Sequence, residues 1–393
     1  MGILTINSGS SSVKVSLYEL GDAETLIFKG TLDRIGVEGS QFLAKDAAGK
    51  HLVRQDVHLP DHIAAFKTLF AWLSAHKVGE SVHAVGHRLV HGGADHIKPA
   101  LVTREVVKDL NSLIPLAPDH LPHEIKAIET VGRIFPNLPQ VACFDTAFHR
   151  RMPLCAQRFA LPSDLMDKGV MRYGFHGLSY EYLFQELTKE AGVQAANGRI
   201  VMAHLGNGAS MAAIYKGDSR DTTMGMTPTG GLVMSARCGD LDPGVLMYLL
   251  QVRGMTPEAL NYMLNHESGL LGVSCLSPDM QDLLEQEKKN PRAAEAVALF
   301  CYQAKKHLGS LAAVLGGLET LIFAGGIGEN SSVVRARICS DLEFLGIKLD
   351  HAHNDAGAPI ISSVESRVTV RVMKTNEELM IARHTQDLLA SQS

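Results

Sequence analysis

The sequence predicts an α/β protein with mixed sheets, built as two related domains, and three observations support this. The chain has 393 residues, which is more than one hydrophobic core usually serves. In each half, strand-like alternation occurs together with stretches of helical periodicity. Each half also contains the same kind of hairpin, made of a short apolar run, a small glycine-containing turn and a second run. This repeat indicates two domains with mixed sheets flanked by helices.

The duplicated hairpin is the most informative of these observations. It spans residues 3–15 in the first half and 200–212 in the second, and aligning Gly9 with Gly206 also aligns a tyrosine nine residues further on. Each copy predicts a β-hairpin whose tip offers backbone N–H groups and small side chains. Such a tip suits a phosphate, because nothing bulky prevents close approach and exposed N–H groups favour an anion. The pair predicts two domains that bind one polyphosphate from both sides.

The first half is expected to begin with strands and to continue with alternating helices and strands. The strand-like segments of the first 60 residues are 13–20, 25–31, 41–45 and 52–59. Asp61 is expected to cap a helix that extends to residue 73. The remaining patterns predict strands at 82–90 and 141–144 and helices at 103–113 and 123–135.

The character of the sequence changes near residue 150, which indicates a crossover into the second domain. Beyond the second hairpin, the expected strands are 320–324 and 368–372, and the expected helices are 179–191, 243–253, one starting at 257, 291–315, 331–340 and 376–390. The apolar stretch 308–328 is interpreted as a helix end, a turn and a buried strand, because its polar residues and glycines argue against a membrane span.

Composition excludes several classes of protein. Apolar residues make up 46% of the chain and charged residues 20%, as in an ordinary globular protein. The net charge is −5 with no long basic run, so no nucleic-acid partner is expected, and an anionic ligand would need a local cluster of Arg or Lys. No two of the six cysteines are close enough for a zinc ribbon. No signal peptide is visible, and we expect a cytoplasmic protein without membrane contact.

The first half holds three candidates for anion chemistry. Lys14 shares a strand face with Ser10 and Ser12 and could reach a bound phosphate, or it could be a surface lysine on a hairpin. Arg88, at a strand end before glycines, could bind a small carboxylate with two hydrogen bonds, or form an exposed salt bridge. Asp145 follows an apolar strand, which suits an active-site carboxylate and a helix N-cap equally well.

The second half adds a histidine, an arginine and a glycine-rich turn. His176 lies between glycines and could donate to an anionic transferring group, or could simply pack in a loop. Arg237 is a second candidate for binding an anion. Residues 325–330 follow a buried strand and precede a predicted helix, a context compatible with a nucleotide. The chain has neither GxGxxG at this turn nor GxxxxGK[ST] anywhere, so a dinucleotide fold and a P-loop are disfavoured.

Taken together, these motifs resemble those of the acetate kinases, a family of the acetate and sugar kinase/Hsp70/actin superfamily. The resemblance covers essentially the whole chain and keeps the same order. It rests on the segments Asn7–Lys14, Gly86–Gly93, Phe144–His149, Arg172–Gly177, His204–Gly208, Arg237–Pro243, Gly326–Asn330 and Thr375–Glu378.

The resemblance implies two duplicated actin-like (ribonuclease H-like) domains with a cleft between them. Residues 1–150 would form the domain on the acyl-substrate side, with 376–393 packing back on it, and 151–375 the nucleotide-binding domain with the dimer interface. It implies a homodimer and reversible transfer of phosphate from Mg-ATP to acetate, giving ADP and acetyl phosphate. Propionate or another short-chain acid is the alternative acceptor.

The resemblance also assigns roles residue by residue. It implies catalytic roles for Asp145, His176 and Arg237, and acyl-substrate binding by Arg88, Val90, His120 and Pro228. It implies Mg²⁺ (or Mn²⁺) binding by Asn7 and Glu377. It implies ATP binding by Ser10, Ser12, Lys14, His204, Leu205, Gly206, Asn207, Gly208, Asp279, Met280, Gln281, Gly326, Ile327, Gly328, Glu329 and Asn330.

The chemistry of a carboxylate acceptor agrees with this set. A carboxylate is already ionised at neutral pH, since its reference pKa is about 4, so it needs no general base. The difficulty is to bring an anion to a polyanion, and Arg, Lys, His and Mg²⁺ reduce that repulsion. We therefore interpret Asp145 as a magnesium or positioning ligand rather than a proton acceptor.

Three positions depart from the family pattern. Asp119 stands where the family usually has a leucine of the pocket for the acetate methyl group, which makes the preferred acid uncertain. Gln281 replaces an arginine that usually flanks the adenine, which makes the nucleotide uncertain. Residues 227–231 read Thr-Pro-Thr-Gly-Gly where Thr-Pro-Leu-Glu-Gly is common, although Pro228 is kept.

Overall fold

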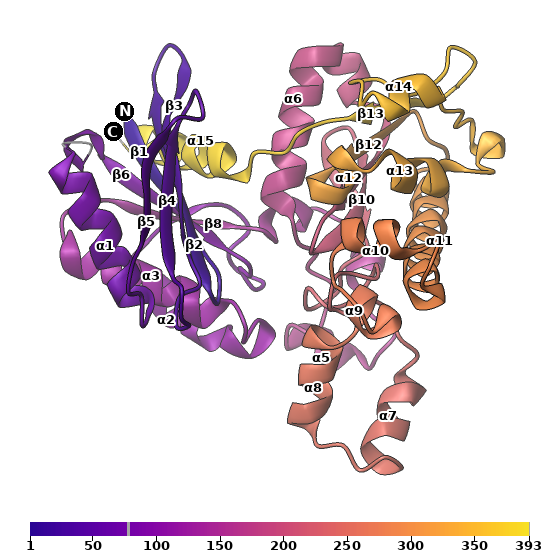
Figure 1. The fold of residues 1–393 in the computed structure, drawn as a ribbon, viewed down its shortest axis with the longest axis horizontal. Coiled ribbons are helices and arrows are strands. Elements are labelled where there is room, and N and C mark those ends of the chain that lie inside the picture. Colours follow the sequence, from indigo (N-terminus) through magenta and orange to yellow (C-terminus); the bar gives the residue numbers. More distant parts are fainter. Residues whose placement is uncertain (77–78, 393) are drawn as a thin grey trace. The chain divides into compact units, whose positions relative to one another are not determined.

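The computed structural model describes residues 1–76 and 79–392, so Ser393 at the end of the predicted 376–393 segment lies outside it. The chain divides into two compact units (Figure 1). Unit 1 consists of Met1–Phe148 and Asn376–Ser393, and unit 2 of His149–Thr375. Each unit is described by itself below.

Unit 1 is built on an eight-stranded mixed sheet in the order β5-β4-β3-β2-β1-β6-β8-β7. Its strands are β1 (Gly2–Ser8), β2 (Ser12–Leu20), β3 (Glu24–Asp33), β4 (Gln41–Asp46), β5 (His51–Asp56), β6 (Ala84–Leu89), β7 (Ala100–Leu101) and β8 (Gln140–Phe144). Its helices are α1 (His62–Ala75), α2 (Arg104–Ser112), α3 (Leu121–Ile134) and α15 (Glu377–Ala390). Strands β1, β6 and β8 run parallel, so their carboxyl ends meet at one edge.

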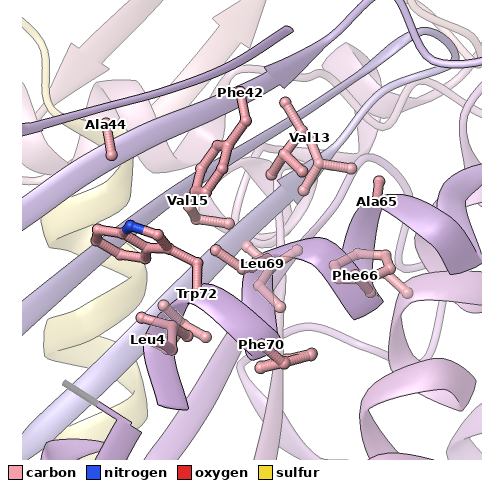
Figure 2. Packing of buried hydrophobic residues seen from close by; sticks show 14 of the residues in the cluster. Leu4, Val13, Val15, Phe42, Ala44, Ala65, Phe66, Leu69, Phe70 and Trp72 are labelled. Carbon is pink, nitrogen blue, oxygen red and sulfur yellow. The ribbon is translucent and has the colours of Figure 1, made fainter. Parts of the chain in front are cut away.

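Alternation along the strands produces the core of unit 1. Leu4 of β1 and Val13 and Val15 of β2 pack against α1, and Trp72 of that helix lies beside Phe42 of β4 (Figure 2). These side chains are nearly or fully buried, and apolar burial is the main favourable term in folding. The predicted cap is confirmed, because the Asp61 carboxylate accepts a hydrogen bond from the Ala64 N–H.

The last helix, α15, packs on β1, β2, β6 and β8 of this same sheet. It approaches closely at Gly86 of β6, where an added Cβ would lie 2.4 Å from Thr385 Oγ1 and 2.5 Å from Ile381 Cγ2. A residue larger than glycine would require these side chains or the helix to move. The contact places the first residue of α15, Glu377, on the face of the sheet that carries Arg88, because Gly86 and Arg88 point the same way.

Unit 2 is built on a five-stranded mixed sheet in the order β11-β10-β9-β12-β13. Its strands are β9 (Arg199–Leu205), β10 (Ala209–Tyr215), β11 (Asp218–Thr222), β12 (Thr320–Ala324) and β13 (Thr369–Val372). Its helices are α4 (Leu154–Gln157), α5 (Ser163–Asp167), α6 (Gly177–Ala196), α7 (Pro243–Gln251), α8 (Pro257–His266), α9 (Gly269–Ser274), α10 (Met280–Gln286), α11 (Pro291–Val314), α12 (Gly325–Asn330), α13 (Ser332–Cys339) and α14 (His351–Asp355).

The two sheets share a core of five strands with the same pairing. In unit 1 the order β3-β2-β1-β6-β8 has two antiparallel pairs followed by two parallel pairs. The order β11-β10-β9-β12-β13 in unit 2 repeats this pattern. Strands β1 and β9 both have seven residues, and each leads into a three-residue hairpin tip. The prediction of an α/β fold with two mixed sheets is confirmed.

Two local predictions for unit 2 were wrong or incomplete. Residues 325–330 were expected to form a turn, but they form helix α12, which starts directly after β12. Gly325 permits this because its φ is +76° and an added Cβ would lie 2.7 Å from the Leu205 carbonyl. Strand β11 was not predicted, because its sequence Asp-Ser-Arg-Asp-Thr has no apolar alternation. Among the described residues, no helix combines the length and hydropathy that crossing a bilayer requires.

Candidate functional site

In unit 1, the carboxyl ends of three parallel strands bring together polar side chains far apart in the sequence. Asn7 ends β1 next to the hairpin tip, Arg88 lies near the end of β6, and Asp145 follows β8. Asp145 is held there by a hydrogen bond from its N–H to the Leu89 carbonyl. Glu377 adds a carboxylate from the start of α15. Ligand sites of open α/β sheets form at such carboxyl ends.

The guanidinium of Arg88 lies at the centre of this group. Its Nη2 donates to Asp145 Oδ2 at 2.6 Å and its Nε donates to the same carboxylate at 3.2 Å. Its Nη1 donates to Asn7 Oδ1 at 3.3 Å, and Glu377 Oε2 lies 3.8 Å from Nε. Burial alone would lower the pKa of Arg88, but Asp145 and Glu377 raise it above the ordinary value, so the group stays protonated.

These hydrogen bonds leave Arg88 capacity for a ligand. A guanidinium has five N–H groups, and three of them serve Asp145 and Asn7. One N–H on each terminal nitrogen makes no hydrogen bond among residues 1–76 and 79–392, and the Arg88 side chain is 19% exposed while Asp145 is fully buried. Both readings of Arg88 from the sequence therefore apply in part. It forms a salt bridge, although a buried one, and it keeps the two donors that a carboxylate requires.

Glu124 is a residue of this region that the sequence did not single out. It lies in the first turn of α3, is almost fully buried, and its Oε2 accepts the N–H of Val90 at 3.0 Å. Burial raises the pKa of Glu124 to about 8, while the Val90 hydrogen bond and the charge of Arg88 oppose this rise. Only the helical position of Glu124 on an otherwise apolar face could have marked it as buried.

The first hairpin tip lies beside the same group. Lys14 pairs with Asn7 across the hairpin, and Ser10 and Lys14 are exposed. The positive charge of Lys14 lowers the pKa of Glu377, although burial of that carboxyl raises it overall. The tip is held by His62, whose Nε2 lies 2.7 Å from the Gly9 carbonyl oxygen, and this residue too was missed.

The remaining predicted residues of unit 1 surround the start of α3. His120 is the residue before the helix and is half-buried, as is Asp119. The negative charge of Asp119 raises the pKa of His123, whereas burial and the charge of His62 lower it. Asp119 is thus close enough to His123 to interact electrostatically with it. Val90 is buried and is held by Glu124 as described above.

In unit 2, the second hairpin tip is the meeting point of a histidine and an arginine side chain. A Cβ added to Gly208 would lie 3.1 Å from Nε2 of His176 and 3.8 Å from Nη1 of Arg237. Nη1 of Arg237 also donates to the Pro228 carbonyl at 3.0 Å, which fixes its position. Both groups thus face the space directly above the glycine. An anion on this tip would be within reach of both.

His176 itself has an unusual backbone. It precedes α6 with φ 59° and ψ 24°, the left-handed region that costs energy for a residue with a Cβ. Its ring stacks on that of His204 with the centroids 4.3 Å apart. The His204 ring is held by a hydrogen bond between its Nδ1 and the Ser179 hydroxyl at 2.8 Å. Non-glycine residues in this conformation are concentrated at functional sites.

The two glycine-rich segments of unit 2 adjoin each other. A Cβ added to Gly206 would lie 3.7 Å from the Gly326 nitrogen, and nothing lies within 4 Å of a Cβ added to Gly326. Asn207 in the tip accepts hydrogen bonds from Ser235 through its carbonyl and its amide oxygen. Backbone and small side chains thus line an accessible surface between the tip and α12.

Several predicted nucleotide residues have structural partners in the chain. The Glu329 carboxylate accepts the N–H groups of Gly325 and Thr375, and the Asn330 amide donates to the Gly326 carbonyl. These bonds fix α12 at the end of β12. Of the remaining predicted residues, Leu205 ends β9, and Ile327 and Gly328 lie within α12.

The segment at 279–281 forms the start of α10. The Asp279 carboxylate accepts the N–H groups of Gln281 and Asp282, so its side chain acts as the N-cap. Met280 is buried, and the exposed Gln281 donates to Glu285 at 3.3 Å. The predicted site residues therefore form two groups. Unit 1 contains Asn7, Ser10, Ser12, Lys14, Arg88, Val90, His120, Asp145 and Glu377, and unit 2 contains all the others.

Comparisons with known proteins place this arrangement in a family. The model of the acetokinase family matches residues 2–383. The chain belongs to the acetokinase family. It is 47% identical to an acetate kinase of Rhodopseudomonas palustris, over 97% of each chain.

Solved structures of this family are similar over the same extent. An acetate kinase from Porphyromonas gingivalis matches with a TM-score of 0.90 and 39% identity, over 99% of each chain. A propionate kinase from Francisella tularensis matches with a TM-score of 0.93 and 36% identity, over 98% of this chain and 99% of that one. Acetokinase-family membership and these likenesses confirm the predicted fold class of duplicated actin-like domains.

Proposed function

We propose that this chain transfers the γ-phosphoryl group of ATP directly to acetate, and catalyses the reverse transfer from acetyl phosphate to ADP. The observation that carries the proposal is the convergence of His176 Nε2 and Arg237 Nη1 on the tip at Gly208. Two fixed N–H donors, one of them on a guanidinium, above a glycine-rich turn suit a phosphoryl group that spreads negative charge over its oxygens during transfer. The curated relatives are acetate kinases.

The group around Arg88 supports a carboxylate as the acceptor. Its two remaining N–H donors suit the two oxygens of a carboxylate, and buried Val90 supplies an apolar neighbour for a short acyl tail. An ionised carboxylate needs no base to attack phosphorus. In this proposal Arg88 binds and orients acetate, while His176 and Arg237 stabilise the transferring group and Lys14 contributes positive charge.

The residues around Arg88 also fit a divalent cation. Asn7, Asp145 and Glu377 present amide and carboxylate oxygens within 3.8 Å of one guanidinium. Mg²⁺ prefers oxygen ligands and often binds through one or two carboxylates together with phosphates, and Mn²⁺ accepts similar ligands. Bound there, the ion would neutralise charge on the phosphates. Asp145 would then position either the ion or Arg88, and it would not accept a proton.

We assign the acyl substrate to unit 1 and the nucleotide to unit 2. The surface between the tip at Gly206 and the open Gly326 has the small residues that allow ATP to approach backbone. In this proposal both groups of residues are expected to be essential for phosphoryl transfer. The reaction is assigned to the cytoplasm, where ATP is available.

We further assign a homodimer, with α7 in the interface. This nine-residue helix is largely apolar, yet none of its residues is buried, and Val245, Met247 and Tyr248 are exposed. Exposed apolar surface of this kind marks a protein interaction site. Sedimentation of the purified chain and of a Met247→Glu variant tests the assignment, with a dimer expected for the first and a monomer for the second.

A second acceptor is supported by a particular observation. The chain carries Asp119 at the start of α3, where it interacts with His123, and a solved relative is a propionate kinase. Propionate or another short-chain acid is therefore the alternative substrate.

A trapping assay tests the proposed reaction. The protein is incubated with ATP, Mg²⁺, hydroxylamine and one acid at a time from formate to butyrate, and the hydroxamate is measured. We expect hydroxamate that depends on the acid and on ATP, with acetate giving the highest kcat/KM. Release of ADP that is equally fast without any acid would refute acyl transfer. A maximum at propionate would replace acetate by the alternative.

A further inference from the structure

A buried chain of hydrogen bonds ends at His176 and uses two residues with no role in the site described so far. Nδ1 of His176 lies 2.8 Å from the Ser210 hydroxyl, and that hydroxyl lies 2.5 Å from the Tyr180 hydroxyl. Ser210 and Tyr180 are fully buried, and His176 is 9% exposed. Ser210 pairs with His204 across β9 and β10, so the sheet itself fixes its place.

The chemistry of the three groups favours one direction for these hydrogen bonds. A serine hydroxyl has one hydrogen, so Ser210 can donate to only one of its neighbours. Tyr180 keeps its proton, because burial raises its pKa. A hydrogen bond with the His204 backbone lowers the same pKa, as an N–H that donates to the phenol oxygen does. In this arrangement the Tyr180 O–H donates to Ser210, and Ser210 donates to Nδ1 of His176.

The other nitrogen of the ring points to the hairpin tip. Nε2 of His176 lies 3.1 Å from the Cβ position above Gly208, close to Nη1 of Arg237. When Nδ1 accepts a hydrogen bond, the neutral imidazole carries its hydrogen on Nε2. Stacking on His204 keeps the ring from turning away. The result is a neutral N–H donor at the surface of the tip.

We propose that Ser210, oriented by Tyr180, is a positioning residue that holds His176 as the Nε2–H tautomer and aims this N–H at the transferring phosphoryl group. The inference rests on the proposed function for the role of His176. The tautomer itself is a property of the free protein and is measured without any substrate.

The first test is ¹⁵N NMR of the full-length protein labelled at histidine, with the His176 resonances identified by their loss in His176→Gln. We expect a protonated Nε2 and an unprotonated, hydrogen-bonded Nδ1 at neutral and mildly alkaline pH. In Ser210→Ala and Tyr180→Phe, a fraction of the Nδ1–H form should appear. A wild-type spectrum with the hydrogen on Nδ1 would overturn the proposal.

The second test is kinetic and has a matched control. Ser210→Ala should lower kcat by about 10-fold to 100-fold with little change in KM, as expected for loss of a residue that orients a catalytic group. Ser210→Thr keeps the hydroxyl and should retain most of the activity. The control is Ser219→Ala, because the buried Ser219 hydroxyl holds Nδ1 of His149 at 2.9 Å in the same unit. Nε2 of His149 lies 3.0 Å from the Phe175 carbonyl oxygen, and the proposed function gives His149 no role.

The two tests separate the inference from the proposed function. Equal losses of kcat in Ser210→Ala and Ser219→Ala would reduce Ser210 to a structural role and refute the inference. An Nε2–H spectrum in a protein that forms no acyl phosphate would refute the proposed function and the phosphoryl target, while the tautomer would stand. A double-mutant comparison tests whether Ser210 acts through His176. If it does, Ser210→Ala lowers kcat in the wild-type background but causes no further loss when it is added to His176→Gln.

Discussion

The ion pair between Arg88 and Asp145 offers the sharpest test of the unit 1 geometry. Replacing Arg88 by Met keeps most of the side-chain volume but removes the charge that compensates Asp145. The Asp145 carboxylate is fully buried and is bound through two nitrogens of Arg88. Removing one partner of a buried pair costs about 3–5 kcal/mol, because the other charge is left without compensation. Asp145→Asn alone should cost a similar amount.

A double-mutant cycle measures the interaction. The double variant Arg88→Met/Asp145→Asn should lose clearly less than the sum of the single losses, since no charge is then left alone. Urea unfolding followed by tryptophan fluorescence suits this measurement, because the chain has one tryptophan, Trp72, and it lies in the core of unit 1. Additive losses, or a loss below about 1 kcal/mol for Arg88→Met, would refute the buried pair.

Three further predictions concern the sites themselves. Gly208→Ala places a methyl group where His176 and Arg237 meet and should lower kcat by about 100-fold. The control Gly309→Ala, in open space on α11, should leave kcat unchanged. Equal activities of the two variants would contradict the convergence of His176 and Arg237 on Gly208. The pKa of Glu124 is raised to about 8, so its contribution to stability is complete below pH 4.5 and is lost as the pH rises through 8. In urea unfolding, the free energy of unfolding of Glu124→Gln should therefore rise relative to that of the wild type by about 4 kcal/mol between pH 5 and pH 9. A difference that stays constant with pH would rule this out. Asp119→Leu should raise kcat/KM for acetate in the hydroxamate assay, and an unchanged acid preference would remove Asp119 from the acyl pocket.

Local signals in the sequence predicted much of the fold. The hairpins at Gly9 and Gly206 follow from alternation around small turn residues, and the N-cap Asp61 follows from its place before a helical pattern. Strand β11 escaped prediction because an edge strand is held mainly by backbone hydrogen bonds and needs no apolar alternation.

The site was predicted as a set of residue types rather than as contacts. Arg88 and Asp145 are 57 residues apart, and only the parallel pairing of β6 with β8 brings them together. Burial of Glu124 and the hydrogen bond between Ser210 and His176 depend likewise on tertiary packing. Asp279 differs from these residues, because its contact is local. The resemblance assigns it to the nucleotide, but its carboxylate accepts the N–H of Gln281, two residues further along the chain.

The fate of an acetate oxygen tests the central claim, that a carboxylate oxygen bonds to the phosphorus transferred from ATP, most directly. The protein is given ATP, Mg²⁺ and acetate labelled with ¹⁸O in both oxygens, and the acyl phosphate is cleaved by hydroxylamine at its carbonyl carbon. Our account predicts that the released phosphate carries one ¹⁸O atom, because the bridging oxygen comes from acetate. Phosphate without label would mean that water attacks ATP and would contradict the account.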